Sequence, residues 1–119
     1  MKLRIKGNSI RLRLSKEEVD QLVESEQVWS RCDMPINRLT YGIELADVEE
    51  MSAAFKNSKL RVVMPRFMVA NWHTSDLVGF DHTDSNDLYI LVEKDFKCLV
   101  PRPNEDETQL YKNPLSNES

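Results

Sequence analysis

The chain matches itself when it is shifted by fifty positions, and this internal repeat is the feature that most constrains its fold. Residues 1–14 align with residues 51–64 without a gap, and the triplet Ile-Arg-Leu at 10–12 falls on Leu-Arg-Val at 60–62. A repeat of this length is the sequence signature of a supersecondary unit that is used more than once. We therefore expect two similar units that pack against each other.

Alternation of apolar and basic residues predicts a β-hairpin at the start of each unit. Residues 2–6 and 9–14 show the two-residue period of strands, with apolar side chains on one face and basic ones on the other. Gly7 and Asn8 both tolerate a positive φ and therefore suit a tight turn. The second unit predicts the equivalent hairpin over 51–56 and 59–64.

A short helix and two further strands are predicted after each hairpin. Ser15 and Glu18 form a capping box for a helix over about 15–25, whose apolar stripe includes Val19 and Leu22. Pro65 suits the first turn of a second helix over about 65–73. The other predicted strands are 27–32, 38–45, 77–82 and 88–92. Each half is thus β-β-α-β-β.

The predicted fold is mostly β, an α+β domain with two short helices. One unit is too small to bury both a sheet face and a helix stripe, so the duplicated units are expected to interlock as an intramolecular swapped-hairpin-like pseudo-dimer, a barrel or sandwich. The single domain covers 1–103, as repeats 1–50 and 51–95 plus an extended segment to 103. Residues 104–119 are polar and acidic, which predicts a flexible C-terminal tail.

Composition predicts a cytoplasmic protein that does not enter a membrane. Apolar residues make up 40% and charged residues 30% of the chain. No segment approaches the roughly 18 apolar residues of a membrane span, and the N-terminus lacks the apolar core of a signal peptide. The two cysteines, Cys32 and Cys98, lack CxxC spacing and are expected to be reduced and structural.

The sequence predicts neither an enzyme nor a cofactor or metal site. Its three glycines are isolated, so no phosphate-binding loop is present, and no Ser/His/Asp or Cys/His set has catalytic spacing. His73 and His82 are the only histidines and lack the spacing of a ligand pair. The acids Asp81, Asp84 and Asp87 do not follow the order of a calcium loop. The tryptophans and Tyr41 fall at periodic positions typical of core packing.

The first hairpin carries a candidate binding surface. Residues 1–16 contain six basic residues and no acidic one, although the net charge of the chain is −4. Strand alternation places the basic side chains opposite the apolar ones. The candidate binding residues are Lys2, Arg4, Lys6, Asn8, Arg11 and Arg13. The alternative is a solvated sheet face whose long charged side chains prevent edge aggregation.

Two resemblances add to this prediction. Gly7-Asn-Ser-Ile-Arg-Leu-Arg-Leu-Ser-Lys16, followed by a short helix, resembles the start of AbrB/MazE-like swapped-hairpin domains, and Leu60-Arg-Val-Val-Met-Pro-Arg66 resembles the same strand-to-helix junction. In that family two chains interlock into a barrel whose basic hairpins contact DNA. The resemblance implies DNA contacts at Arg4 and Arg13, with phosphate contacts at Lys2, Lys6 and Arg11. The opening MKLRIKGNSIRLRL and the later LVEKDFKCL resemble a family of small uncharacterised bacterial proteins.

These observations favour a small, non-enzymatic binding or interaction protein that acts through the basic N-terminal hairpin. Its partner is expected to be acidic, either a protein or DNA, and the chain a monomer or homodimer. The alternative is a DNA-binding, antitoxin-like or transition-state-type transcriptional regulator. Arg4 and Arg13 correspond to Ala54 and Val63 in the second half, so a two-fold reader of DNA would lack charge on one side.

Overall fold

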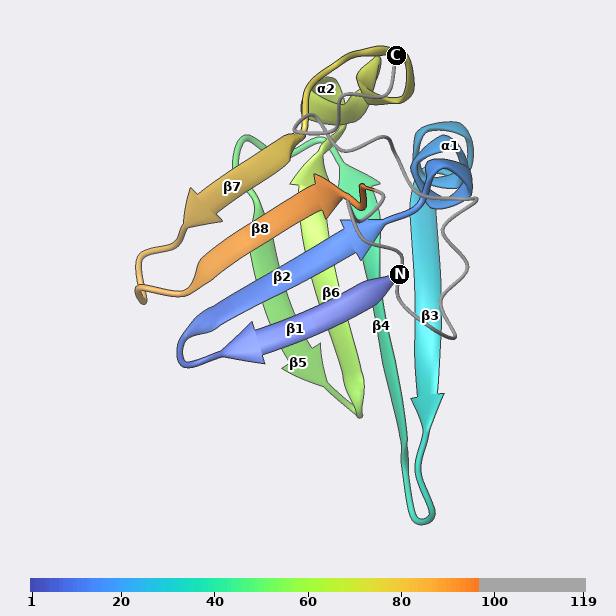
Figure 1. Ribbon diagram of the computed structural model, residues 1–119. Coiled ribbons are helices and arrows are strands. Elements are labelled where there is room, and N and C mark those ends of the chain that lie inside the picture. The colour runs from blue at the N-terminus through green and yellow to red at the C-terminus, as the bar shows by residue number, and fades with distance from the viewer. Residues whose placement is uncertain (97–119) are drawn as a thin grey trace.

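Two four-stranded sheets packed face to face form the body of the protein, with short helices at one end (Figure 1). The computed structural model describes residues 1–96, and the expectations for Cys98, the segment to 103 and the tail at 104–119 lie outside these residues. The elements are β1 (Lys2–Lys6), β2 (Ser9–Leu14), α1 (Lys16–Ser25), β3 (Gln27–Asp33), β4 (Arg38–Ala46), β5 (Ser52–Lys56), β6 (Lys59–Pro65), α2 (Arg66–Val69), the 3-10 turn η1 (Trp72–Thr74), β7 (Gly79–Thr83) and β8 (Tyr89–Lys94). The predicted strands and hairpins are present, with bounds that differ by two residues at most.

Each sheet joins strands from both halves of the chain. The first sheet has the order β1-β2-β8-β7 and the second the order β3-β4-β6-β5. A parallel pair forms the centre of each sheet, β2 with β8 and β4 with β6, and the other pairs are antiparallel. The first sheet therefore contains the first two and the last two described strands, and the second sheet contains the four strands between them.

The predicted barrel is wrong, because the two sheets do not join into a closed cylinder. Within residues 1–96 the first sheet ends at β1 and β7 and the second at β3 and β5, so four strands are edges. The apolar inner faces bury each other instead. Leu12 and Val92 of the first sheet belong to the same buried cluster as Ile43 and Val62 of the second. The two sheets therefore form a sandwich.

The first helix begins as its sequence predicts. The Ser15 hydroxyl oxygen accepts a bond from the Glu18 amide at 3.3 Å, and the Ser15 amide donates to the Glu18 carboxylate at 2.9 Å. This is a complete capping box, which satisfies helical amides that would otherwise lack partners. Val19 and Leu22 are fully buried, so α1 covers one end of the core.

The second predicted helix, 65–73, is split into α2 and η1. Asn71 has φ −119° and ψ 18°, which lies outside the helical region, and η1 begins at the next residue. Trp72 is buried, and its indole nitrogen donates to the Leu77 carbonyl at 2.8 Å. Burial of this large side chain outweighs the continuation of a regular helix. No helix within residues 1–96 is long and apolar enough to cross a membrane.

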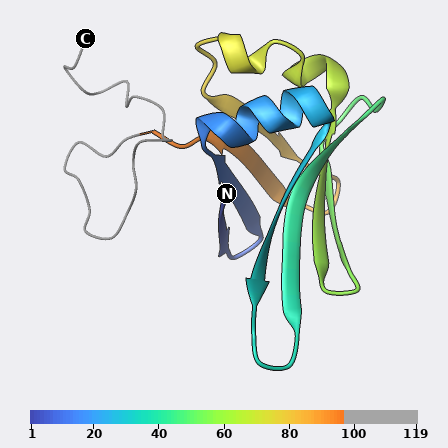
Figure 2. The same ribbon diagram turned by 90° about the vertical axis from the view of Figure 1, so that its right-hand side faces the viewer.

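The helices lie at one end of the sandwich, and the turns of both hairpins lie at the other (Figures 1 and 2). Gly7 occupies the first turn with φ 54°, and Asn57 and Ser58 occupy the second with φ 53° and 61°. The positive φ of Gly7 agrees with the prediction of a tight turn there, whereas Asn8 does not have a positive φ. The sandwich is therefore covered by helices at one end only.

Trp29 does not lie in the core, contrary to the sequence-based expectation. It is half-buried on the outer face of the second sheet, opposite Gly42 in the pairing of β3 with β4. The Lys59 ammonium lies 4.3 Å from the centre of the indole ring. A Cβ atom at Gly42 would overlap both the Trp29 ring and the Val28 carbonyl, so the indole is able to lie across β4 only because position 42 has no side chain. Trp72 is buried as expected, and Tyr41 packs against the core.

We expect Gly42→Ala to lower the free energy of unfolding by about 1–3 kcal/mol, because the added methyl group meets backbone and ring atoms. Urea denaturation of the full chain measures this change. The control is Ser52→Ala at the exposed start of β5, with a change below about 0.5 kcal/mol. Equal stabilities for Gly42→Ala and the wild type would contradict the described packing of Trp29.

Candidate anion-binding surface

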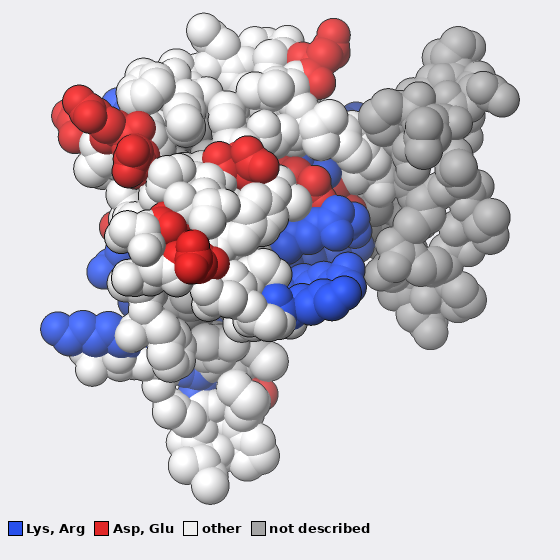
Figure 3. Space-filling view, turned by 90° about the vertical axis from the view of Figure 1, so that its left-hand side faces the viewer, with Lys and Arg blue, Asp and Glu red and all other residues white. Residues whose placement is uncertain are grey.

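The basic side chains of the first hairpin share the outer face of the first sheet. In the pairing of β1 with β2, Lys2 lies opposite Arg13 and Arg4 lies opposite Arg11. Alternate residues of a strand point to the same side, and the apolar residues between them face the core. We call this surface the basic face; it consists of Lys2, Arg4, Lys6, Arg11 and Arg13. Figure 3 shows Lys and Arg side chains gathered on the side of the molecule where β1 and β2 lie.

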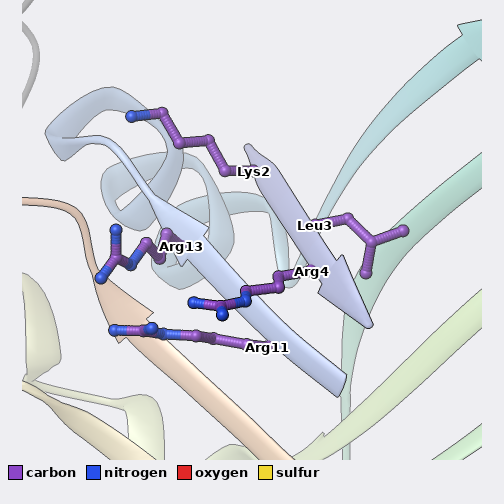
Figure 4. A pocket seen from close by; sticks show the side chains of 5 residues that line it. All are labelled: Lys2, Leu3, Arg4, Arg11 and Arg13. Carbon is purple, nitrogen blue, oxygen red and sulfur yellow. The ribbon is translucent and has the colours of Figure 1, made fainter. Parts of the chain in front are cut away.

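Three guanidinium groups of the basic face converge. Figure 4 shows Arg4, Arg11 and Arg13 pointing in the same direction, whereas Leu3 extends from the opposite side of β1. A hollow of about 170 Å³ is lined by these three arginines together with Lys2 and Leu3. A second hollow, of about 250 Å³, lies beside Lys6 and shares Arg4 and Arg11 with the first. Arg4 and Arg11 thus separate two adjoining depressions in a cationic surface.

Glu93 of β8 is the acidic partner of two of these arginines. Its Oε1 accepts a hydrogen bond from Arg11 Nε at 2.6 Å and from Arg13 Nε at 3.0 Å. Its side chain is 13% exposed, so this carboxylate is largely shielded from water. Three guanidinium groups and one carboxylate leave the cluster of Arg4, Arg11, Arg13 and Glu93 with a charge of +3 − 1 = +2. The sheet therefore positions an excess of positive charge at one place.

Arg4 and Lys6 are exposed and have no acidic partner among residues 1–96. Neither side chain forms an ion pair or a hydrogen bond within residues 1–96. An exposed guanidinium offers five N–H donors in a planar fork that matches carboxylates and phosphates. These two side chains are therefore the members of the basic face that an acidic ligand engages without first displacing a protein carboxylate.

Lys2 has a different environment at the far end of β8. Its Nζ lies 2.8 Å from the carboxylate of Asp95, which is buried. The neighbouring Lys94 is also buried, and its Nζ donates to the Ser75 carbonyl at 2.6 Å. Burial lowers the pKa of Lys94 from its ordinary value, because desolvation disfavours the charged amine. Lys2 therefore helps to satisfy a buried charge at the end of the first sheet.

Asn8 has a structural role rather than a place on the basic face. Its Nδ2 donates to the Asp87 carbonyl at 2.7 Å, and its own carbonyl accepts from the Tyr89 amide at 3.0 Å. These bonds join the β1–β2 turn to the start of β8. The Asn8 side chain is thus occupied by the protein backbone.

Two polar residues of β8, Tyr89 and Glu93, lie beside the basic face, and sequence reasoning did not assign either of them to the site. The Tyr89 hydroxyl donates to the Asp81 carboxylate at 2.9 Å, and this bond is the main cause of the raised pKa of Tyr89. Tyr89, Leu91 and Glu93 occupy alternate positions of β8 on its outer face, and this two-residue period is the signal that the sequence contains for Tyr89 and Glu93. Their relation to Arg11 and Arg13 depends on the pairing of β2 with β8, which links residues about eighty positions apart.

The histidines and acidic residues do not form a metal centre in the described part of the chain. No group of three or more His, Cys, Asp or Glu side chains within residues 1–96 is placed to hold an ion. His82 lies 3.7 Å from the Glu50 carboxylate, and Cys32 is exposed. Asp84 accepts hydrogen bonds from the amides of Asn86 and Leu88, which makes it a turn-forming residue.

Comparisons with known proteins identify the family of the chain but assign it no function. Neither the curated proteins nor the solved structures contain a significant match. The model of the family of unknown function DUF7009 matches residues 1–115, which is nearly the whole chain. This agrees with the resemblance to an uncharacterised family in the opening and the later segments of the sequence. The chain belongs to DUF7009, a family of unknown function.

Proposed function

We propose that the protein is a non-enzymatic, cytoplasmic binding protein that holds an acidic segment of a partner protein on its basic face. The observation that carries this proposal is the convergence of Arg4, Arg11 and Arg13 on one hollow, where Arg11 and Arg13 share the carboxylate of Glu93. Arginine forks bind carboxylates through paired hydrogen bonds, which are stronger than bonds between neutral groups. A surface with an excess of two positive charges suits a short run of Asp or Glu residues.

Preorganisation supports the proposal. Arg11 and Arg13 are half-buried and share Glu93, so their guanidinium groups are already held side by side before a ligand arrives. Less side-chain freedom is then lost when the partner binds. Arg4 is exposed and lies next to them, and it supplies the donors that Glu93 does not occupy. We infer that Arg4 makes the first contact and that the held pair completes the recognition.

A protein partner is favoured over duplex DNA by the arrangement of charge. Lys56, Lys59 and Arg61 also carry positive charge on the outer face of the second sheet. The inner faces of the sheets pack against each other, so the outer faces point away from one another and do not meet one duplex. Glu93 and Asp81 border the basic face, and the net charge is −4, which disfavours a long polyanion.

A DNA-binding, antitoxin-like or transition-state-type regulator is the second candidate function. The observation that favours it is the position of Arg4 and Arg13, the two residues to which the AbrB/MazE resemblance assigns DNA contacts. Both extend outward from the same hairpin face and line the same hollow. A single hairpin of this kind would contact phosphates on one side of a groove.

We also infer that the two halves are duplicated units that form an intramolecular pseudo-dimer. Each half has the order β-β-α-β-β, and each sheet combines a hairpin of one half with two strands of the other. An equivalent ion pair supports this inference. Arg61 Nε lies 3.2 Å from the Glu44 carboxylate in the second sheet, as Arg11 lies beside Glu93 in the first. In both sheets the pair joins a hairpin to the central strand of the other half.

The proposal predicts that Arg4→Ala/Lys6→Ala weakens binding of a fluorescein-labelled oligoglutamate peptide about tenfold at low salt, because two accessible cations are lost. Fluorescence anisotropy across a salt series measures the affinity. The matched control is Arg31→Ala/Arg38→Ala, which makes the same change in net charge on the β3–β4 hairpin and is expected to bind normally.

Two outcomes would decide against this interpretation. Equal losses in both double variants would show that net charge alone determines binding. Micromolar binding of a mixed-sequence DNA duplex, weakened steeply by salt and by Arg4→Ala/Lys6→Ala while the peptide fails to bind at about 50 mM salt, would establish the DNA-binding candidate instead.

Glu93→Gln is predicted to act in the opposite direction on binding. It removes the carboxylate that offsets Arg11 and Arg13, so the charge of the cluster rises from +2 to +3 and the peptide binds severalfold more tightly. The same change is expected to lower the free energy of unfolding by about 1 kcal/mol, because the two guanidinium groups then repel each other. Glu44→Gln in the second sheet is the control, with similar destabilisation and unchanged peptide binding. Unchanged affinity in Glu93→Gln would argue against the cluster as the binding site.

A further inference from the structure

The described part of the chain ends beside the basic face. The Asp95 amide donates to the Leu14 carbonyl at 2.9 Å, so the contact between β8 and β2 extends past the last residue of β8. The Asp95 carboxylate lies 2.8 Å from Lys2 Nζ, which belongs to the basic face. Phe96 is the last described residue. The chain that follows Phe96 therefore begins next to the basic face.

The sequence beyond this point contains the longest acidic run of the chain. Glu105, Asp106 and Glu107 carry three consecutive negative charges, whereas at most two acidic residues are adjacent elsewhere. The arginine cluster of the basic face, with Glu93 included, has a charge of +2. Arginine forks form paired hydrogen bonds with carboxylates. The acidic run Glu105–Glu107 therefore complements the basic face in both the sign of its charge and the chemistry of its groups.

The acidic run is within reach of the cluster. Since Arg13 pairs with Glu93 in the parallel register of β2 and β8, Asp95 lies about four residues further along than Arg11. Four strand residues span about 13 Å, and neighbouring strands lie about 5 Å apart. Nine chain steps lead from Phe96 to Glu105 and span up to about 30 Å. The intervening chain is thus about twice as long as the path that the acidic run must cover.

Attachment to the same chain makes a weak contact sufficient. A short linker holds a segment at an effective concentration in the millimolar range. A contact that would have a dissociation constant of about 1 mM as a free peptide then forms in at least about half of the molecules. Arg4 and Lys6 are exposed and have no acidic partner among residues 1–96, so their donors are accessible to the acidic run.

We propose that the acidic run docks on the basic face of its own chain, with its carboxylates at the arginine-lined hollow (Figure 4). The regulatory part of this inference rests on the proposed function, because it makes the acidic run a built-in competitor of the acidic partner. The partner then displaces the acidic run and leaves Glu93 in place. Only a partner segment that contacts the basic face more strongly than the tethered run binds well, which raises selectivity against weakly acidic ligands.

The first test measures docking without an added ligand. The tail variant, Glu105→Gln/Asp106→Asn/Glu107→Gln in the full chain, is expected to shift the Nε–Hε NMR signals of Arg4 and Arg11 and to leave those of the second sheet unchanged. The difference from the wild type is expected to disappear at about 0.5 M salt, because screening releases the acidic run. Unchanged arginine signals at low salt would overturn the proposal. A shift that depends on protein concentration would contradict it too, because the acidic run would then dock on a second copy.

The second test measures competition. At low salt the tail variant is expected to bind the fluorescein-labelled oligoglutamate peptide at least about threefold more tightly than the wild type, because the competing carboxylates are lost. The matched control is Asp20→Asn/Glu24→Gln/Glu49→Gln, which removes three negative charges from exposed positions outside the acidic run and is expected to change the affinity less than about 1.5-fold.

The outcomes of the two tests separate this inference from the proposed function. An equal gain in the tail variant and its control would show a general effect of net charge and overturn competition. Shifted arginine signals without any gain in affinity would also overturn competition. Shifted arginine signals in a protein that binds no peptide in either form would establish docking and contradict the proposed function instead.

Discussion

The parallel pairing of β2 with β8 and of β4 with β6 is the interaction on which the rest of the structure depends. It joins the first hairpin to the last two described strands and the second hairpin to the two strands before it. Buried strands must satisfy their backbone donors and acceptors, so each hairpin needs a partner from the other half. The first fifty residues alone contain half of each sheet. A stable core therefore requires both halves together.

The properties of the basic face follow from this pairing. Arg11 and Arg13 lie on β2, and the carboxylate that orients them, Glu93, lies on β8. Asn8 similarly connects the first turn to the start of β8. The pairing of β2 with β8 thus holds Arg11 and Arg13 side by side, and preorganisation of this kind favours binding.

Local structure was predictable from sequence, because its determinants are local. Alternation and turn residues gave both hairpins, and the Ser15–Glu18 capping box gave the start of α1. The break at Asn71 was not predictable, since it depends on burial of Trp72 against the rest of the protein. The prediction of a closed barrel was wrong. Periodicity shows which face of a strand is apolar, but it does not show whether the edge strands meet.

In the candidate site, too, the features set by local sequence were predictable and those set by long-range contacts were not. The composition of residues 1–16 was sufficient to locate the basic face, and all five of its cations lie on one side of the sheet. Its electrostatic balance was not predictable, because Glu93 reaches Arg11 and Arg13 across a pairing of strands that are far apart in sequence. Trp29 was assigned to the core because its position is periodic, yet Gly42 opens a place for the ring on the outer face. In each case the missing information was a long-range strand neighbour.

Native-state hydrogen exchange of the full chain tests the interlocked fold most directly. If the two halves form one cooperative unit, the slowest amides of β2 and β8 exchange with the same free energy as those of β4 and β6, equal to that of global unfolding. Markedly faster exchange of β2 and β8, with the second sheet still protected, would contradict the account. The first hairpin would then be a separable element, and the basic face would not be a rigid surface.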